Sequence, residues 1–506
     1  MDLILVGLAL ATVIWLYFHS NPMQHSRAFM LRRFINWFPL GMSYAFLYMG
    51  RYNLSVSKNA MGSMMTKADF GIIFGIGTFV YGLSFLLNGP LVDKFGGKKG
   101  IVLATLGSSL ANMLMGLVTY LYITGALSSN IVVIYSTLYS LNMFFQSYGA
   151  VSIIKVKAYW FHVRERGLFG AIFGTLISMG VYFAFDWGQA IVEAAKVQQQ
   201  GQLTPFQTAF KWLFAVDTGT HDAIWLVFFI PAVLLVFWAL IDMFLIKDSP
   251  SETGFEDFDT ADASSGEMEQ DFTVGQLLKK IFTNPVMLTI AAVEFTSGVL
   301  RNGTQQWYFI FAKEVPQPGA EIFMKHWGLF LCITGIMGGF ASGAMSDKIF
   351  HSRRGPPAAI MSGLMLTCLI LMAIFLLDAP VVVGACVLVI AFAVIGVHSI
   401  MSGTAAADFG GRKATATASG ITDGFVYLGS GIQSVCLGFL TTKDWEFWPV
   451  FLAPFALLGL VLALRMWREL PAATRKYLET VEKIDIRISS KKTVIKTTSS
   501  LSLTDG

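Results

Sequence analysis

The sequence is poor in charge for its length. Charged residues make up 13% of the 506 positions, whereas hydrophobic residues make up 55%. This charged fraction is about half of that in a typical soluble chain. So few charged side chains cannot give several soluble domains a polar surface. The composition therefore predicts a protein that lies largely within a lipid bilayer.

Reactive side chains are scarce as well. The sequence has four cysteines and seven histidines, and the cysteines fall in apolar runs without disulfide or metal-ligand spacing (Cys332, Cys368, Cys386, Cys436). It contains no nucleophile elbow, no phosphate-binding Gly-Lys-Ser/Thr loop and no metal-spaced His/Cys cluster. A net charge of +4 gives no reason to expect a nucleic acid partner. We therefore expect no enzyme activity, no cofactor and no metal.

Long apolar runs are abundant instead. A helix needs about 20 apolar residues to cross a bilayer, and twelve stretches reach this length. They form two sets of six, separated by an acidic, serine-rich linker. The first set covers residues 34–56, 69–91, 100–124, 130–154, 168–190 and 222–246; the second covers 286–312, 325–345, 358–377, 381–406, 415–440 and 447–467.

One further apolar run, residues 3–18, precedes the twelve. It begins with Asp2 rather than a basic residue and has no small-residue cleavage site, so we expect an uncleaved extra helix, not a signal peptide. The expected domains are an N-terminal helix, a six-helix bundle, a cytoplasmic linker, a second six-helix bundle and a basic tail (1–20, 30–246, 247–280, 281–470 and 471–506).

The distribution of basic residues predicts the orientation. If the loop after the second of the twelve spans is cytoplasmic, the cytoplasmic segments hold 27 of the 36 lysines and arginines, the outer segments hold 7, and 2 lie within spans. This asymmetry follows the positive-inside rule. We therefore expect a cytoplasmic C-terminus, in a plasma membrane and by default a bacterial inner membrane, and a monomer in the lipid bilayer.

Two pairs of loops repeat between the halves. GPLVDKFGGKK (89–99) matches GAMSDKIFHSRR (343–354), and YWFHVRERG (159–167) matches ADFGGRKATATASG (407–420). Matched loops at a fixed period indicate a duplication. We therefore expect an all-α membrane protein of two six-helix bundles related by a pseudo-two-fold axis.

The first loop resembles the Gly-x-x-x-Asp-(Lys/Arg)-x-Gly-x-(Lys/Arg)-(Lys/Arg) motif of the major facilitator superfamily. A short turn would let Asp93 cap a neighbouring helix and pair with basic groups, and Asp347 would do the same in the second half. Such contacts would latch the cytoplasmic ends of the halves together, the alternative being a basic topology anchor. The candidate gating residues are Gly89, Asp93, Lys94, Asp347, Lys348, Arg164, Glu165 and Arg166.

Only two basic residues lie in the interior of the predicted spans, away from their ends. Arg51 and Arg301 fall in the first helix of each half, offset by the repeat period. A guanidinium in hydrocarbon costs at least about 2.5–3.5 kcal/mol, so two at equivalent positions need a shared explanation. Facing one cavity, they would suit a doubly charged oxyanion such as phosphate. The alternative for Arg51 is snorkelling to the interface.

Around these arginines the sequence resembles the organophosphate:phosphate antiporter family. SYAFLYMGRYNLS is similar to its first helix, SGVLRNGTQQW to its seventh, KAYWFHVRERG to its fourth-to-fifth loop, and KDSPSETGF to the end of its first half. The resemblance implies that Arg51 and Arg301 bind the phosphoryl group. It also places further polar side chains in the cavity (Tyr44, Tyr48, Tyr81, Tyr427 and Gln146).

The chain departs from that family near the predicted site. Phe85 stands where the family has a lysine after the serine that aligns with Ser84, and Ile177 stands in place of a histidine. The segment Gly149–Ser152 replaces the usual Gly-Trp-Pro-Pro. In compensation, this chain has Glu294, His398 and Asp423 within spans, which are either structural pairs or groups that couple a proton or hold the organic part of the substrate.

Three functions are open from the sequence. The first is exchange of an organic phosphate ester, of the sugar phosphate or glycerol phosphate class, for inorganic phosphate by alternating access. The second is proton-coupled symport of an anion, with Glu294 or Asp423 as the protonation site. The third is a receptor of the same fold that binds a sugar phosphate without transporting it.

Overall fold

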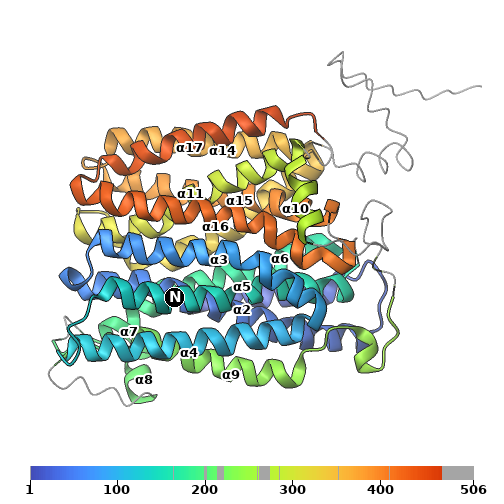
Figure 1. Cartoon of the computed structure of the whole chain (residues 1–506), viewed down its shortest axis with the longest axis horizontal. Coiled ribbons are helices and arrows are strands. Elements are labelled where there is room, and N and C mark those ends of the chain that lie inside the picture. Colours follow the sequence, from blue (N-terminus) through green and yellow to red (C-terminus); the bar gives the residue numbers. More distant parts are fainter. Residues whose placement is uncertain are drawn as a thin grey trace, which may run out of the picture.

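In the part of the chain that the computed structural model describes, all regular secondary structure is helical, with no strand. This part comprises residues 2–162, 165–198, 202–213, 221–258, 260, 274–283, 285–350, 353–409 and 411–469. The long helices run side by side as one bundle (Figure 1). Every predicted span coincides with a helix, so the predicted all-α membrane fold is confirmed.

The long helices fall into the two predicted sets. The first comprises α2 (Arg27–Met61), α3 (Lys67–Phe95), α4 (Gly97–Ile123), α5 (Ile131–Trp160), α6 (Arg166–Tyr182) and α9 (Leu226–Leu245). The second comprises α11 (Pro285–Glu314), α13 (Trp327–Ala344), α14 (Gly355–Phe375), α15 (Pro380–Phe409), α16 (Gly411–Lys443) and α17 (Phe447–Arg465). We call these sets the first half and the second half.

Shorter elements complete the fold. The extra N-terminal helix is α1 (Asp2–His19), and α6 continues through a π-helical turn (Phe183–Trp187) into α7 (Gly188–Ala194). Three short helices, α8 (Pro205–Leu213), α10 (Val274–Thr283) and α12 (Glu321–Lys325), lie outside the predicted spans. Single-turn helices cover Gly62–Met64, Pro250–Thr253 and Met345–Ile349.

Local sequence sets the starts of the first long helices. The Ser26 side chain accepts the backbone N–H of Phe29 and caps α2. Thr66 and Asp69 form a reciprocal capping box at the start of α3. Both caps satisfy backbone N–H groups that have no partner inside the helix. The chain turns between α3 and α4 at Gly96, whose φ of 97° lies in a region that side chains disfavour.

Eight of the described helices are long and apolar enough to cross a membrane by length and composition alone: α3, α4, α9 and α13 to α17. The helices α2, α5 and α11 are also long, with 35, 30 and 30 residues, but carry more polar residues. Each buries polar side chains inside the bundle, such as Arg51 on α2, Gln146 on α5 and Arg301 on α11. Both arginines of the predicted site therefore lie on helices outside these eight, whereas Tyr81 and Tyr427 lie on α3 and α16, which are among the eight.

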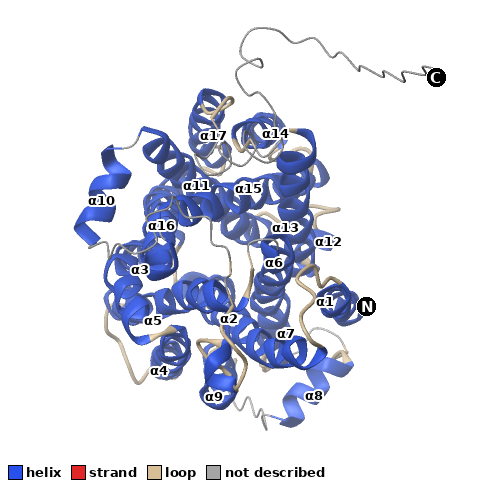
Figure 2. Ribbon diagram, turned by 90° about the vertical axis from the view of Figure 1, so that its right-hand side faces the viewer, coloured by secondary structure: helices blue, strands red, loops and turns tan. Residues whose placement is uncertain are grey.

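Two helix pairs join the halves. Seen along the bundle, α3 lies beside α16 on one side and α6 beside α13 on the other, while α4, α9, α14 and α17 lie at the periphery (Figure 2). Small residues allow α3 and α16 to approach closely: a Cβ atom on Gly71 would lie 2.5 Å from the Ser434 carbonyl oxygen. These two helix pairs place α2 and α11 across from each other near the centre of the bundle (Figure 2).

The extra helix α1 is attached near both of its ends. At its C-terminal end, the Tyr17 hydroxyl donates to the Met30 carbonyl at 2.7 Å and accepts from Arg33 Nε at 3.0 Å. At its N-terminal end, Asp2 Oδ2 lies 2.6 Å from Nδ1 of His326, next to the start of α13. Because Met30 belongs to the first half and His326 to the second, α1 contacts both halves along the α6 side of the bundle.

Candidate anion site

Arg51 lies inside the bundle with its guanidinium enclosed. Its side chain is 0% exposed. The guanidinium donates hydrogen bonds to Gln146 Oε1 at 2.9 Å, to the Tyr427 hydroxyl at 2.9 Å and to the Tyr81 hydroxyl at 3.0 Å. The rings of Tyr48 and Tyr81 face its central carbon at 4.7 and 4.4 Å. These neutral partners orient the guanidinium without neutralising its charge.

A second polar layer, which the sequence analysis missed, holds Gln146. Its Nε2 donates to Asn142 Oδ1 at 3.1 Å and to Ser108 Oγ at 3.2 Å. Asn142 Nδ2 donates in turn to the Gly50 carbonyl at 2.8 Å. The signal was present on α5, because two amides four residues apart in a membrane helix share one face. This layer fixes the residue before Arg51 against α5.

Arg301 reaches the same region from α11. Its side chain is 4% exposed and donates from Nη2 to the Tyr48 hydroxyl at 3.3 Å. Its Nε is buried and has no hydrogen-bond partner among the described residues. The ring of Tyr44 packs edge-to-face on Tyr48, with 5.4 Å between the centroids. The structure therefore gathers all seven predicted binding residues around two guanidiniums, and neither guanidinium forms an ion pair with any described residue.

A cluster of titratable side chains lies beside Arg301. His398 Nδ1 lies 2.9 Å from Glu294 Oε2, and Ser402 Oγ donates to Asp423 Oδ1 at 2.8 Å. We call Glu294, His398 and Asp423 the acidic cluster. Its members come from α11, α15 and α16, and all three interact electrostatically with Arg301. The sequence predicted these residues individually; the structure brings them together.

Comparison with known proteins assigns the chain to a family. Residues 40–434, well over half of the chain, match the Major Facilitator Superfamily. The chain belongs to this superfamily. Its apolar helices and this membership make it an integral membrane protein.

Relatives of this Major Facilitator Superfamily protein share low identity over most of its length. It is 23% identical to the "Probable hexose phosphate transport protein" of Chlamydia trachomatis, covering 90% of this chain and 96% of the relative. It is 23% identical to the "Glycerol-3-phosphate transporter" of Bacillus subtilis (84% and 90%). It is 22% identical to the "Membrane sensor protein UhpC" of Salmonella typhimurium (80% and 85%). The resemblance drawn from the helix motifs is thereby confirmed.

Solved structures show the same fold. The superfamily transporter FucP, in its outward conformation, aligns with a TM-score of 0.57 at 15% identity, covering 86% of this chain and 99% of FucP. A bacterial homologue of the human lysosomal transporter Spinster, in its inward-facing conformation, aligns with a TM-score of 0.60 at 15% identity, covering 90% and 99%. The superfamily and the transporters named here are not enzymes, in agreement with the sequence analysis.

The halves are clasped together at one end of this superfamily fold, which we call the Glu314 end. The carboxylate of Glu314, on the second half, binds Lys58 Nζ at 2.9 Å and Lys67 Nζ at 2.8 Å, both on the first half. Lys67 Nζ also lies 4.5 Å from the ring centre of Trp445. Next to this clasp, Asn59 Nδ2 donates to the Phe309 carbonyl at 2.9 Å. This clasp was not predicted from the sequence.

A helix cap joins the halves at the same end of the bundle. The carboxylate of Asp186, in the π-helical turn after α6, accepts the backbone N–H groups of Gly328 and Leu329 at 2.7 and 2.9 Å. The first N–H groups of a helix carry positive partial charge and lack partners within the helix. Asp186 therefore fixes α6 to the N-terminus of α13.

The predicted gating residues lie around the opposite end, which we call the Asp93 end. Asp93 occupies the last turn of α3 rather than a loop, and its Oδ1 binds Lys155 Nζ of α5 at 3.0 Å. The N-terminus of α4 is capped by another carboxylate, because Lys98 N–H donates to Asp248 Oδ1 at 2.8 Å. Gly89 is buried within α3.

The remaining gating residues divide between exposed and undescribed positions. Lys94 and Lys348 are exposed. Arg164 lies outside the described residues, and so do the side chains of Arg166 and Asp347. The predicted latch between the halves at this end therefore stays a prediction.

Glu165 forms its main contact within the first half. It makes a two-pronged ion pair with Arg33, both bonds measuring 2.8 Å, and both side chains are fully buried. Burial by itself raises the pKa of the Glu165 carboxyl, but contacts with His25 and Arg33 outweigh this effect and bring the pKa down to about 2. The Glu165 carboxylate thus ties the loop after α5 to α2.

Replacing Glu165 with glutamine is expected to destabilise the protein by about 3–5 kcal/mol, because it leaves the Arg33 charge buried without its partner. The folded-state pKa lies below the ordinary value of 4.5. The contribution is therefore complete above that value and lost as the pH falls toward 2. Thermal unfolding in detergent should show equal destabilisation at about pH 5.5 and about pH 8. Glu446→Gln, an exposed control, should change little; a destabilisation already gone at pH 5.5 would contradict the ion pair.

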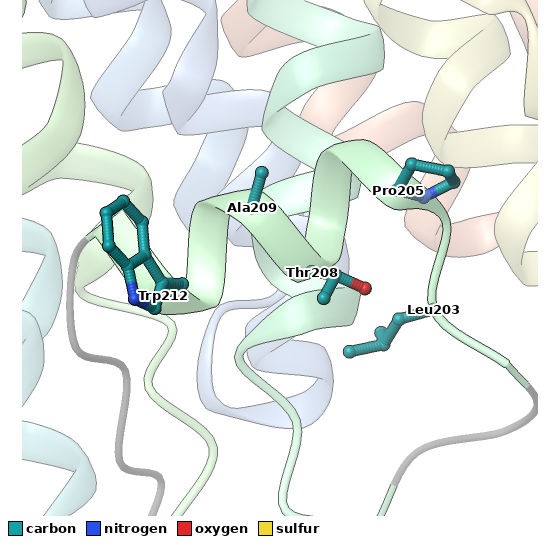
Figure 3. Close-up of a pocket in the computed structure, with 5 residues that line it drawn as sticks. All are labelled: Leu203, Pro205, Thr208, Ala209 and Trp212. Atoms are coloured by element: carbon teal, nitrogen blue, oxygen red, sulfur yellow. The ribbon is translucent and has the colours of Figure 1, made fainter.

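A surface pocket lies away from these residues. It has a volume of about 600 Å³ and is lined by Leu203, Pro205, Thr208, Ala209 and Trp212, around α8 (Figure 3). None of these five side chains carries a charge. The pocket therefore has no group that would select a phosphate over a neutral molecule, and it does not compete with the arginine pair as the anion site.

Proposed function

We propose that this protein exchanges an organic phosphate ester for inorganic phosphate across its membrane, with Arg51 and Arg301 holding the phosphoryl group. One observation carries this proposal. The two guanidiniums come from equivalent helices of the two halves, contact the same tyrosine (Tyr48) and lack carboxylate partners among the described residues. Two forked cations held by neutral groups retain their charge for an anion.

The relatives support the choice of anion. Those named as hexose phosphate and glycerol-3-phosphate transporters align over most of this chain. A phosphate bound by one arginine from each half would draw the halves together, whereas two like charges in low dielectric repel each other. Occupied sites would therefore rock between the two faces of the membrane more readily than empty ones, which is the property of an exchanger.

The proposed orientation follows from the basic residues. The Asp93 end carries most of the lysines and arginines, so we place it in the cytoplasm together with the C-terminus. The clasp at the Glu314 end then closes the outer face. In an alternating-access cycle, this clasp and the Asp186 cap must break before the site opens outward, and the cytoplasmic ends must close in their place.

Counterflow in proteoliposomes tests the exchange. Purified protein in vesicles preloaded with inorganic phosphate is expected to take up radiolabelled phosphate, and unlabelled glucose 6-phosphate or glycerol 3-phosphate should compete. Vesicles without internal phosphate should show little uptake. Equal uptake with and without internal phosphate would contradict exchange. Binding of a sugar phosphate without any transport would favour a receptor, the role named for the related sensor UhpC.

A further inference from the structure

The acidic cluster changes the charge of the proposed anion site. Glu294 lies seven residues before Arg301 on α11, about 10 Å along the helix, and Asp423 lies four residues before Tyr427 on α16, about 6 Å. The Tyr427 hydroxyl in turn accepts a hydrogen bond from Arg51. The cluster is thus close to both arginines, on their Asp93 side, in a region where a charge left unneutralised is costly.

The formal charges of the two arginines and the two carboxylates cancel. Arg51 and Arg301 contribute two positive charges, and ionised Glu294 and Asp423 contribute two negative charges. With His398 neutral, the site carries no net charge. Among the described residues, the other titratable groups that face it from α2, α3, α5 and α16 are phenols, which are neutral when protonated (Tyr44, Tyr48, Tyr52, Tyr81, Tyr139 and Tyr427). A doubly charged phosphate would therefore leave two uncompensated negative charges in the bundle.

Two atoms of the acidic cluster are placed to accept protons. Oε1 of Glu294 is buried and has no hydrogen-bond partner in the part of the chain that the structure describes, and the Glu294 side chain is 0% exposed. A carboxylate oxygen in that state is unfavourable as an anion and gains by accepting a proton. His398 contacts Glu294 through Nδ1, which leaves Nε2 as a place for a further proton, and its side chain is 26% exposed.

We propose that Glu294, His398 and Asp423 form a proton-binding site that is filled when the anion binds, so that the phosphate group crosses the membrane together with protons. This proposal rests on the proposed phosphate site. Each proton adds to a ring nitrogen or a carboxylate oxygen without any bond being broken in the substrate. Two protons fully compensate a dianion, and one compensates a monoanion. Anion affinity therefore rises as the pH falls, because protonation removes negative charge next to Arg301.

The alternative for these residues is a purely structural pair of hydrogen bonds. A structural pair keeps one protonation state whether or not the anion is bound. A coupling site changes its protonation on binding, because the added negative charge favours protonation of the groups around it. Counting protons taken up per anion therefore separates the two roles.

Isothermal titration calorimetry counts these protons. The detergent-solubilised full chain is titrated with inorganic phosphate in Mes, Hepes and imidazole buffers at one pH, and the slope of binding enthalpy against buffer ionisation enthalpy gives the protons taken up. The wild type is expected to take up at least one proton more per phosphate than the Glu294→Gln/Asp423→Asn variant. The contribution of phosphate itself cancels in this difference.

A matched control is available in the first half. Asp242 is a buried carboxylate on α9 that accepts a hydrogen bond from Ser43 at 2.5 Å and lies outside the acidic cluster. Asp242→Asn should take up as many protons as the wild type. If the double variant does not fold, Asp423→Asn alone keeps the Glu294–His398 contact and should still lower the proton number.

The outcomes separate the two proposals. Equal proton numbers in the wild type and the acidic-cluster variants would overturn the coupling site while leaving phosphate binding intact. Phosphate binding that survives unchanged in Arg301→Ala would overturn the proposed anion site, and the coupling site with it. A larger proton number in the wild type, with binding lost in Arg301→Ala, would support both.

Discussion

Replacing Arg301 with lysine is expected to lower phosphate exchange roughly 100-fold, although the formal charge is kept. The guanidinium offers forked donors that can hold two phosphate oxygens while still bonding the Tyr48 hydroxyl. A lysine ammonium is a single point of contact and is more strongly hydrated. The same substitution at Arg51 should have a similar effect, because lysine cannot reproduce its three hydrogen bonds to Gln146, Tyr427 and Tyr81.

Initial rates of phosphate counterflow, together with phosphate affinity from calorimetry, measure this effect. Arg32→Lys provides the control, because Arg32 is at the Asp93 end of α2 and donates to the Leu245 carbonyl away from the site. This variant should exchange normally. Exchange by Arg301→Lys or Arg51→Lys within a few-fold of the wild type would contradict a forked contact with the anion.

Replacing Gly71 with valine is expected to abolish exchange while leaving a folded protein. A Cβ atom at this position would lie 2.5 Å from the Ser434 carbonyl and 2.8 Å from Cα of Gly438, both on the other half. Backbone atoms cannot move aside as a flexible side chain can, so α3 and α16 would be forced apart at the Glu314 end. The clasp of Glu314 with Lys58 and Lys67 could then no longer close.

Cross-linking distinguishes a folded protein whose halves cannot close at the Glu314 end from a misfolded one. A cysteine pair at Lys58 and Glu314, in a background without the native cysteines, should cross-link readily with Gly71 present and poorly with Gly71→Val. Gly174→Val serves as the control, because a Cβ atom there meets nothing within 4 Å. Normal exchange in Gly71→Val would show that tight packing of α3 on α16 is not needed for the transport cycle.

The proposed coupling site would give the exchanger a direction. The arginine pair alone carries two positive charges and would be neutralised by a dianion. With Glu294 and Asp423 ionised, the same anion needs protons for the same neutrality. A proton gradient could then bias which anion enters and which leaves, and this departs from the simple exchange that the arginines suggest.

Much of this fold could be read from short stretches of sequence. Apolar runs gave every long helix, because a bilayer imposes a minimum length of apolar helix. Arg51 and Arg301 stood out because a guanidinium in hydrocarbon needs a reason that water-exposed arginines do not. The polar character of α2, α5 and α11 likewise marked the helices that bury Arg51, Gln146 and Arg301.

Local pattern was less informative at the helix ends. The segment predicted as a loop around Asp93 is helical as far as Phe95, so Asp93 lies on α3 and binds Lys155. The cap on the next helix comes from Asp248, 150 positions after Lys98. A motif indicates that a carboxylate near a turn caps a helix or forms an ion pair. It does not say which of the nearby carboxylates reaches the N-terminus of the helix.

By itself, therefore, the sequence determined the membrane helices, their grouping into two halves and the pair of buried arginines. Only the tertiary structure decided which side chains meet: Glu165 with Arg33, Glu314 with Lys58 and Lys67, and Glu294 with His398 beside Arg301. The reason is physical. Hydrophobic length and intramembrane charge are properties of one helix in its solvent, whereas each pairing depends on how helices far apart in sequence are rotated and packed against one another.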